Sequence, residues 1–127
     1  MPRMRRLSVI ALALLVAGAG GAHAQSLPKA KWASMMRQVM PSAFCQKGAY
    51  FRACFAQDAA GCVRAANQAV DDCLRQHEAQ IPDMLENPEA GSRWSRVIGA
   101  CAGTLFEMHG RRVKRGAAKC NDPEAWQ

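Results

Sequence analysis

Apolar residues recur every three or four positions through most of the chain after residue 25, which is the spacing of one helix face. The clearest stripes lie in 32–40, 59–79 and 93–109. The third stripe consists of Trp94, Val97, Ile98, Cys101, Leu105 and Met108. No stretch alternates with a period of two, so the pattern predicts no β-strand. We therefore expect an all-α domain, a compact bundle of four or five short helices.

Helix-breaking and capping residues set the expected boundaries in the first part of this pattern. Pro41 is predicted to end or kink the first helix, because the residue before a proline is pushed out of the α region. A second helix is expected to restart there and run over 41–56. Asp58 is a favourable N-cap for the helix that follows. Further on, 81–86 is typical of a single helical turn, and the Asn- and Pro-containing stretch 87–91 indicates a loop.

The helix expected over 93–109 has the best-defined ends. Ser92 is suited to cap its start, and Gly110 is suited to end it. Gly99 and Gly103 stand four positions apart on a second face of this helix. Small residues at that spacing allow another helix to approach closely, so we expect tight internal packing there.

The first 24 residues have the pattern of a secretory signal peptide. Three arginines precede a short apolar run over 7–17, and Ala22, His23 and Ala24 form an A-x-A cleavage site. The apolar run is well short of the roughly 20 residues that span a bilayer. We expect cleavage after Ala24, no membrane span after cleavage, and export to the periplasm or the medium. Residues 25–127 then form a single domain with 14 basic and 10 acidic side chains.

Six cysteines in an exported chain predict three structural disulfides, because the compartments outside the cytoplasm are oxidising. The cysteines are Cys45, Cys54, Cys62, Cys73, Cys101 and Cys120. A domain of this size has a small core, so the disulfides are expected to supply much of its stability.

The pairing of these cysteines depends on how the helices fold back on one another. Cys62 and Cys73 share a helix face but stand roughly 16 Å apart along the axis, too far to bond each other. Folding two helices about 55–60 favours the nested pairs Cys54–Cys62 and Cys45–Cys73, which leaves Cys101–Cys120. This pairing is one of the 15 or so that six cysteines permit.

The residues that most often carry chemistry are not arranged in recognisable motifs. The chain has no C-x-x-C, and His77 and His109 have no nucleophile at a motif spacing. We therefore expect no enzyme and no cofactor. Met35, Met36 and Met40 form a local cluster of soft thioethers that suits Cu(I). The alternative is an apolar helix face that uses adaptable methionines for packing.

Two surface segments are candidates for binding a partner. The basic segment consists of Arg111, Arg112, Lys114, Arg115 and Lys119. It suits an acidic protein face or anionic lipid, whereas export argues against nucleic acid; the simpler alternative is a solvated link to Cys120. The acidic connection 81–91 carries Asp83, Met84, Leu85, Glu86 and Glu89. Its apolar pair, rimmed by acids, is suited to fill a partner's cleft, unless Met84 and Leu85 fold inward as core.

In size, export, helix content and helix-borne cysteines, the chain resembles the small all-helical periplasmic immunity proteins that neutralise type VI secretion cell-wall amidase toxins. The resemblance implies an inhibitor that binds an envelope protein, such as a peptidoglycan-degrading toxin, and occludes its cleft with a loop or helix end. The connection 81–91 is the segment best suited to that role. Two alternatives are a copper-handling carrier that uses the methionine cluster, and a structural envelope component with no enzyme partner.

Overall fold

The computed structural model describes residues 25–127, so the predicted signal peptide lies outside the described residues. The elements in chain order are β1 (Leu27–Pro28), α1 (Lys29–Phe44), α2 (Tyr50–Ala53), α3 (Ala59–His77), β2 (Met84–Leu85), α4 (Pro88–Gly110) and three 3-10 turns, η1 (Arg111–Val113), η2 (Ala118–Asn121) and η3 (Pro123–Trp126). The predicted helical bundle is confirmed, with four α-helices among the described residues. In this part of the chain no helix is long and apolar enough to cross a membrane.

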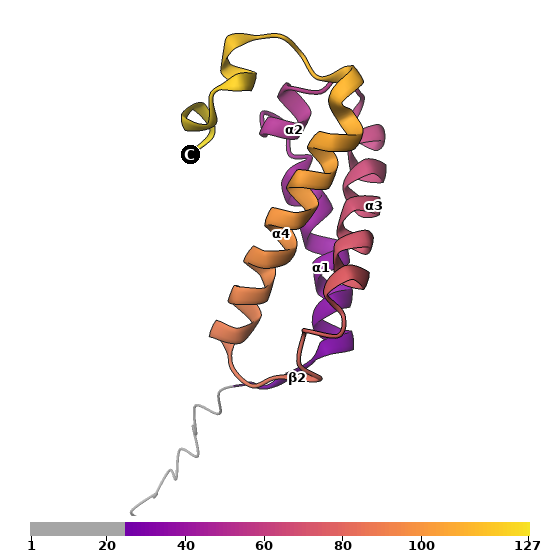
Figure 1. Ribbon diagram of the computed structural model, residues 1–127, viewed down its shortest axis with the longest axis vertical. Helices are drawn as coiled ribbons and strands as arrows, with labels where there is room; N and C mark the ends of the chain where they lie inside the picture. The colour runs from indigo at the N-terminus through magenta and orange to yellow at the C-terminus, as the bar shows by residue number, and fades with distance from the viewer. Residues whose placement is uncertain (1–24) are drawn as a thin grey trace, which may run out of the picture.

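The three long helices run up, down and up along the bundle (Figure 1). α1 and α3 are antiparallel, because Cys45 at the end of α1 is bonded to Cys62 in the first turn of α3. At the opposite end, the ammonium of Lys29 donates to the carbonyl of Ile81, beyond the end of α3, at 3.3 Å. α4 then returns alongside both helices. We call the end with β1 and β2 the lower end and the end with α2 the upper end.

Large side chains on α1 lie against a line of small residues on α4. Trp32, Met36 and Met40 are four residues apart on α1, and they face Gly91, Ser95 and Gly99 in the same order. A Cβ on Gly91 would lie 3.9 Å from the Trp32 ring, and one on Gly99 would lie 4.0 Å from Met40 Cε. A Cβ on Gly103 would lie 3.7 Å from the ring of Phe51. Other elements therefore do pack on the glycine face of α4, and α1 and α4 run parallel.

The core divides into two clusters of buried side chains. The lower cluster contains Trp32, Met36, Ala69, Val70, Cys73, Leu74, Ile81, Leu85, Ala90, Ile98 and Ala102. The upper cluster contains Cys45, Cys54, Phe55, Cys62, Ala66, Phe106 and Cys120, with Tyr50, Phe51 and Trp126 partly buried against it. The lower cluster is mainly aliphatic, whereas the upper one combines cysteines with aromatic rings.

Several predicted boundaries in the first half of the chain are wrong. α1 continues through Pro41 to Phe44, because the buried Pro41 fits the helix and Phe44 packs against both clusters. The second helix is only the four residues of α2, instead of 41–56. Gly48 before it has φ +85°, a conformation that glycine adopts readily and that interrupts a helix. The Asp58 cap is confirmed, since its carboxylate accepts from the N–H of Gly61 at 2.6 Å.

The second half needs two corrections. Residues 81–86 form no helical turn; Leu27 pairs with Leu85, and Pro28 with Met84, in a two-stranded antiparallel sheet. α4 begins at Pro88 rather than after Ser92, so the predicted loop is mostly its first turn. The reason is local, because Asn87 caps the N–H of Ala90 at 2.9 Å and Pro88 at the first position already has a helical φ.

All six cysteines form disulfides, which confirms three bonds, but none of the predicted pairs is present. The observed pairs are Cys45–Cys62, Cys54–Cys120 and Cys73–Cys101. The nested prediction treated 45–73 as one hairpin of two helices. In the structure the hairpin partners of α3 are α1 and α4, so Cys62 meets the end of α1 and Cys73 meets α4. Cys54 follows α2 and is left to bond the C-terminal segment.

Candidate functional site

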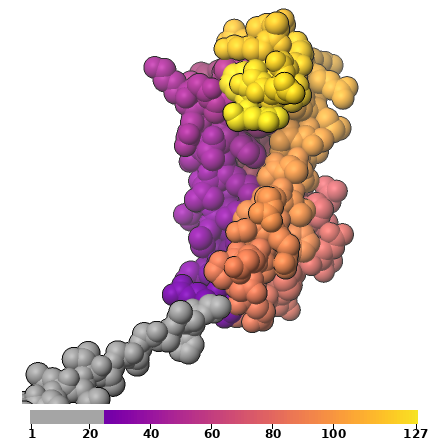
Figure 2. Space-filling model, turned by 90° about the vertical axis from the view of Figure 1, so that its left-hand side faces the viewer, coloured from indigo at the N-terminus to yellow at the C-terminus, as the bar shows by residue number. Residues whose placement is uncertain are grey.

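The C-terminal arm, residues 114–127, is attached to the upper end of the bundle. The Cys54–Cys120 disulfide links it covalently to the residues after α2. At its base, the N–H of Arg115 donates to the carbonyl of Cys54 at 2.7 Å, beside a β-bridge between Phe55 and Lys114. The arm extends beyond α4 and returns beside α2 (Figure 1), and it forms a cap on the upper end of the molecule (Figure 2). This attachment fixes the arm against the bundle.

A cleft of about 420 Å³ lies between the arm and the bundle. We call it the arm cleft; it is lined by Tyr50, Glu107, Lys114, Cys120, Asn121, Asp122, Pro123 and Trp126. Its volume is in the range of small-molecule sites, roughly 300–1,000 Å³. α2 and α4 supply one side of the cleft, and the arm supplies the other.

Two aromatic rings form the apolar part of the arm cleft. The rings of Tyr50 and Trp126 meet edge to face with their centroids 5.3 Å apart. The indole N–H of Trp126 donates to the carbonyl of Lys119 at 2.8 Å, and the Lys119 ammonium lies 5.5 Å from the centroid of the indole ring. The fully buried ring of Phe55 packs edge to face with Tyr50, with 5.7 Å between the two ring centroids. The position of Trp126 is therefore set by a hydrogen bond, a cation–π contact and ring packing together.

A hydrogen-bonded triad of Tyr50, Glu107 and Lys114 forms the polar part of the cleft. The Tyr50 hydroxyl donates to Glu107 Oε1, and the Lys114 ammonium donates to Oε2 at 3.1 Å and to Oε1 at 3.3 Å. Burial, and then the hydrogen bond to Glu107, raises the pKa of Tyr50 above its ordinary value. Interaction with Tyr50, and then with Glu107, raises the pKa of Lys114. The side chains of Lys114 and Glu107 remain 25% and 37% exposed, so a ligand can reach both.

The basic segment predicted from the sequence contributes only part of this site. Lys114 lines the arm cleft, and Lys119 lies over Trp126. Arg111, Arg112 and Arg115 are exposed and do not line the cleft. Sequence reasoning missed the residues that complete it. Tyr50 and Glu107 are 57 positions apart, and the one available signal was an aromatic residue, Trp126, in an otherwise polar tail.

The connection 81–91 is only partly the surface that the sequence predicted. Leu85 is 1% exposed and belongs to the lower cluster, because pairing with β1 turns it inward; this residue follows the alternative in which it folds inward as core. Met84 is 39% exposed. Asp83 forms an ion pair with Lys29 at 2.9 Å, and Glu86 and Glu89 are exposed. A contact surface here consists of Met84 and three acids.

The methionine cluster is divided between the core and the surface. Met36 is 8% exposed, and its sulfur accepts a hydrogen bond from the Ser95 hydroxyl at 3.3 Å. Met40 is half-buried against Gly99, whereas Met35 is 43% exposed. Within residues 25–127, no group of three His, Cys, Asp or Glu side chains is placed to hold a metal ion. Copper binding by the methionines stays a prediction.

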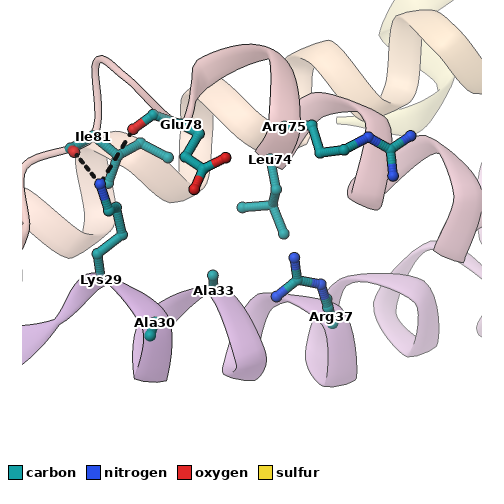
Figure 3. Close-up of a pocket in the computed structure, with 8 residues that line it drawn as sticks. All are labelled: Lys29, Ala30, Ala33, Arg37, Leu74, Arg75, Glu78 and Ile81. Atoms are coloured by element: carbon teal, nitrogen blue, oxygen red, sulfur yellow. Dashed lines mark hydrogen bonds between the residues drawn. The ribbon is translucent and has the colours of Figure 1, made fainter.

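A second, smaller cleft of about 270 Å³ lies between α1 and α3 (Figure 3). Its cationic side chains already have partners within the chain. Arg37 donates to Asp71 at 2.7 Å, Arg75 pairs with Asp72, and Lys29 donates to the carbonyls of Glu78 and Ile81. Figure 3 shows the Glu78 side chain directed into this cleft, above Ala33. The Arg37 and Lys29 contacts join α1 to α3 and to the residues that follow it, whereas the Arg75–Asp72 pair lies within α3. Because these cations are already paired, the arm cleft is the stronger candidate for a ligand site.

The fold and the disulfides together define a small, covalently cross-linked helical protein of the exported class. A family model described as "T2SS substrate NttA" matches residues 26–113, which is more than half of the chain. The chain therefore belongs to the NttA family of type II secretion system substrates, and it is a secreted protein. This finding confirms the predicted export. No curated protein and no solved structure matches the chain.

The family match also corrects the resemblance to periplasmic immunity proteins, which is wrong. Size, export and helix-borne cysteines led to that resemblance, and these properties are shared by any small disulfide-stapled domain outside the cytoplasm. The match ends at Val113, the last residue before the arm. Tyr50 and Glu107 lie inside the matched range, whereas the other six residues that line the arm cleft lie beyond it.

Proposed function

We propose that this secreted protein acts by binding rather than by catalysis, and that it binds a small polar ligand in the arm cleft. The observation that carries the proposal is the partly exposed Glu107–Lys114 pair beside the rings of Tyr50 and Trp126, in a cleft of about 420 Å³. An apolar wall with a few fixed polar groups is the usual composition of a small-molecule site. The disulfide at Cys120 holds these groups in place before the ligand arrives, which lowers the entropic cost of binding.

The polar groups of the cleft are suited to holding a ligand rather than to transferring its protons. Glu107 is hydrogen-bonded by Tyr50 and neutralised by Lys114. The carboxylate of Asp122 caps the N–H of Glu124 at 3.0 Å. Neither histidine of residues 25–127 lines the cleft. The hydrogen bonds that both carboxylates already accept make them weaker bases, but each keeps lone pairs that can accept a hydrogen bond from a ligand.

The test is a fragment screen of the oxidised mature protein by two-dimensional NMR, with neutral, cationic and anionic fragments. We expect saturable shifts confined to the backbone of Tyr50, Lys114 and Asn121 and to the indole N–H of Trp126. Trp126→Ala should abolish them. The matched control is Trp94→Ala, which removes a half-buried tryptophan of α4 that lies outside the cleft. Shifts that persist in Trp126→Ala, or that map to another surface, would contradict the proposal.

A second candidate function is protein recognition through the connection 81–91. It is favoured by the exposure of the apolar Met84 beside Asp83, Glu86 and Glu89. An apolar side chain surrounded by charges has the composition of a small interface centre with a polar rim. The charge-reversal variant described in the Discussion tests this function separately from the arm cleft.

A further inference from the structure

We propose that the ligand of the arm cleft is a saccharide, an inference that rests on the binding function proposed above. Charge is the first argument. Glu107 and Asp122 line the cleft together with Lys114, and Lys119 lies over Trp126. The lining thus has two acids and one lysine, with the second lysine just outside it, and Glu107 is paired with Lys114. A cleft in which both signs of charge lie side by side favours a neutral ligand over a phosphate or a quaternary ammonium, each of which needs one dominant opposite sign.

The mixture of hydrogen-bonding groups is the second argument. Lys114 donates, Glu107 and Asp122 accept, and the amide of Asn121 can do both. A phosphate dianion mainly accepts, and a quaternary ammonium group has neither an N–H to donate nor a lone pair to accept, so either would leave part of this set unmatched. A hydroxyl both donates and accepts. A ligand that carries several hydroxyls can therefore satisfy all of these side chains at once.

The aromatic wall is the third argument. Trp126 is half-buried at the penultimate position of the arm, and its ring is oriented by Tyr50 and by the carbonyl of Lys119. A pyranose ring has an apolar face of C–H groups and a rim of hydroxyls. The C–H face suits contact with an indole, while the hydroxyls reach the polar groups beside it. The aromatic part of the cleft thus suits the C–H face of a sugar, and its polar part suits the hydroxyls.

The arm itself is the fourth argument. It lies beyond the residues that the family model matches, yet it provides six of the eight residues of the cleft. The Cys54–Cys120 disulfide, the hydrogen bond from the Arg115 N–H to the Cys54 carbonyl and the Lys114–Glu107 ion pair hold it on the bundle. Saccharide binding would therefore be a property that this arm adds to the helical scaffold of residues 26–113.

The experiment titrates the oxidised mature protein with glucose, galactose, mannose, N-acetylglucosamine, cellobiose and diacetylchitobiose, followed by NMR and calorimetry. We expect at least one sugar to shift the signals of Tyr50, Lys114 and the Trp126 indole. Trp126→Ala should lower its affinity at least tenfold, whereas Trp126→Phe, which keeps an aromatic face, should lower it much less. Asn121→Ala changes an exposed residue and should weaken binding without disturbing the fold. Trp94→Ala should bind as the unaltered protein does.

Choline and inorganic phosphate are titrated in parallel to separate two kinds of failure. If either binds at the cleft in a Trp126-dependent way while every sugar is inert, the saccharide assignment is overturned and the proposed binding function stands. If no sugar, no fragment and neither of these two probes binds at the cleft, both the saccharide assignment and the proposed binding function are overturned. Sugar binding that is equally strong in Trp126→Ala and Asn121→Ala also overturns the assignment, because the site then lies elsewhere.

Discussion

At the lower end of the bundle, three long helices bury a mainly aliphatic cluster, and only Cys73–Cys101 crosses between two of them there. At the upper end, α2 has four residues, the arm contains only 3-10 turns, and two disulfides join segments 17 and 66 positions apart. Long helices with continuous apolar stripes align many side chains at once. Short, irregular segments bury less surface and lose as much backbone entropy per residue. The upper end therefore depends on covalent links for its order.

This difference matters for function, because the arm cleft lies at the upper end. Tyr50 follows the Gly48 turn, and Trp126 stands on the arm, so neither is held by a long helix. Their positions depend on Cys45–Cys62, Cys54–Cys120 and the packing around Phe55. The lower end acts as a scaffold, and the upper end presents the candidate site.

The largest expected effect is that of reducing all three disulfides. Each closed loop stabilises the fold by about 3–4 kcal/mol in the chain-entropy model, and a typical domain has a net stability of about 5–15 kcal/mol. We expect the reduced protein to unfold or to melt tens of degrees lower, as followed by circular dichroism. An unchanged melting temperature would mean that the helical core is sufficient without them.

Two double variants, each lacking one disulfide, compare the upper and lower ends directly. The first combines Cys54→Ser with Cys120→Ser, and the second combines Cys73→Ser with Cys101→Ser. Hydrogen exchange in the first variant should rise mainly in 46–57 and in the arm, while α1 and α3 stay protected. In the second variant it should rise along α3 and α4. Equal exchange patterns in the two variants would contradict the division of the molecule into two ends.

The next effect concerns Gly110, where α4 passes Phe55. A Cβ at this position would lie 2.7 Å from Cδ1 and Cε1 of the Phe55 ring, which is fully buried. We expect Gly110→Ala to cost about 1–3 kcal/mol through overpacking, as measured by urea unfolding. Gly116→Ala is the control, because nothing lies within 4 Å of its Cβ; it should change stability by less than about 0.5 kcal/mol. If both variants are equally stable, the packing around Phe55 is looser than the structure shows.

A smaller effect is expected from Tyr50→Phe, which removes the hydrogen bond to Glu107. The free energy of unfolding should fall by about 0.5–1.5 kcal/mol at neutral pH. Because the folded-state pKa of Tyr50 is raised, its contribution is complete below the unfolded pKa of about 10 and disappears as the pH rises through the folded value. The raised pKa of Lys114 acts in the same direction. The difference in unfolding free energy between the unaltered protein and Tyr50→Phe should therefore become smaller above about pH 10.

Tyr50 is the single tyrosine in the sequence, so the ultraviolet absorbance of tyrosinate reports its ionisation directly. The midpoint of this titration in the folded protein should lie above that of the urea-unfolded protein. Identical midpoints would contradict the partly buried, hydrogen-bonded position of the Tyr50 hydroxyl.

The smallest expected effect is that of Glu86→Lys combined with Glu89→Lys at the lower end. Both residues are exposed, so the change in unfolding free energy should stay below about 1 kcal/mol, most of it from Glu89 in the first turn of α4. If the connection 81–91 binds a protein partner, that complex should weaken at least tenfold, or about 1.4 kcal/mol. Saccharide binding at the upper end should not change. A partner complex of unaltered strength would remove this connection from the interface.

The sequence by itself determined the features that depend on neighbours along the chain. The apolar stripe of α3 and its Asp58 cap are local, and so are the signal-peptide pattern and the even number of cysteines that predicted oxidation. The tertiary structure decided the disulfide pairs, the passage of α1 through Pro41 and the meeting of Tyr50, Glu107 and Trp126. Periodicity fixes which face of a helix is apolar, but not which other element covers it. That choice depends on how three helices and an arm share one core, and it placed Cys54 against residue 120 instead of residue 62.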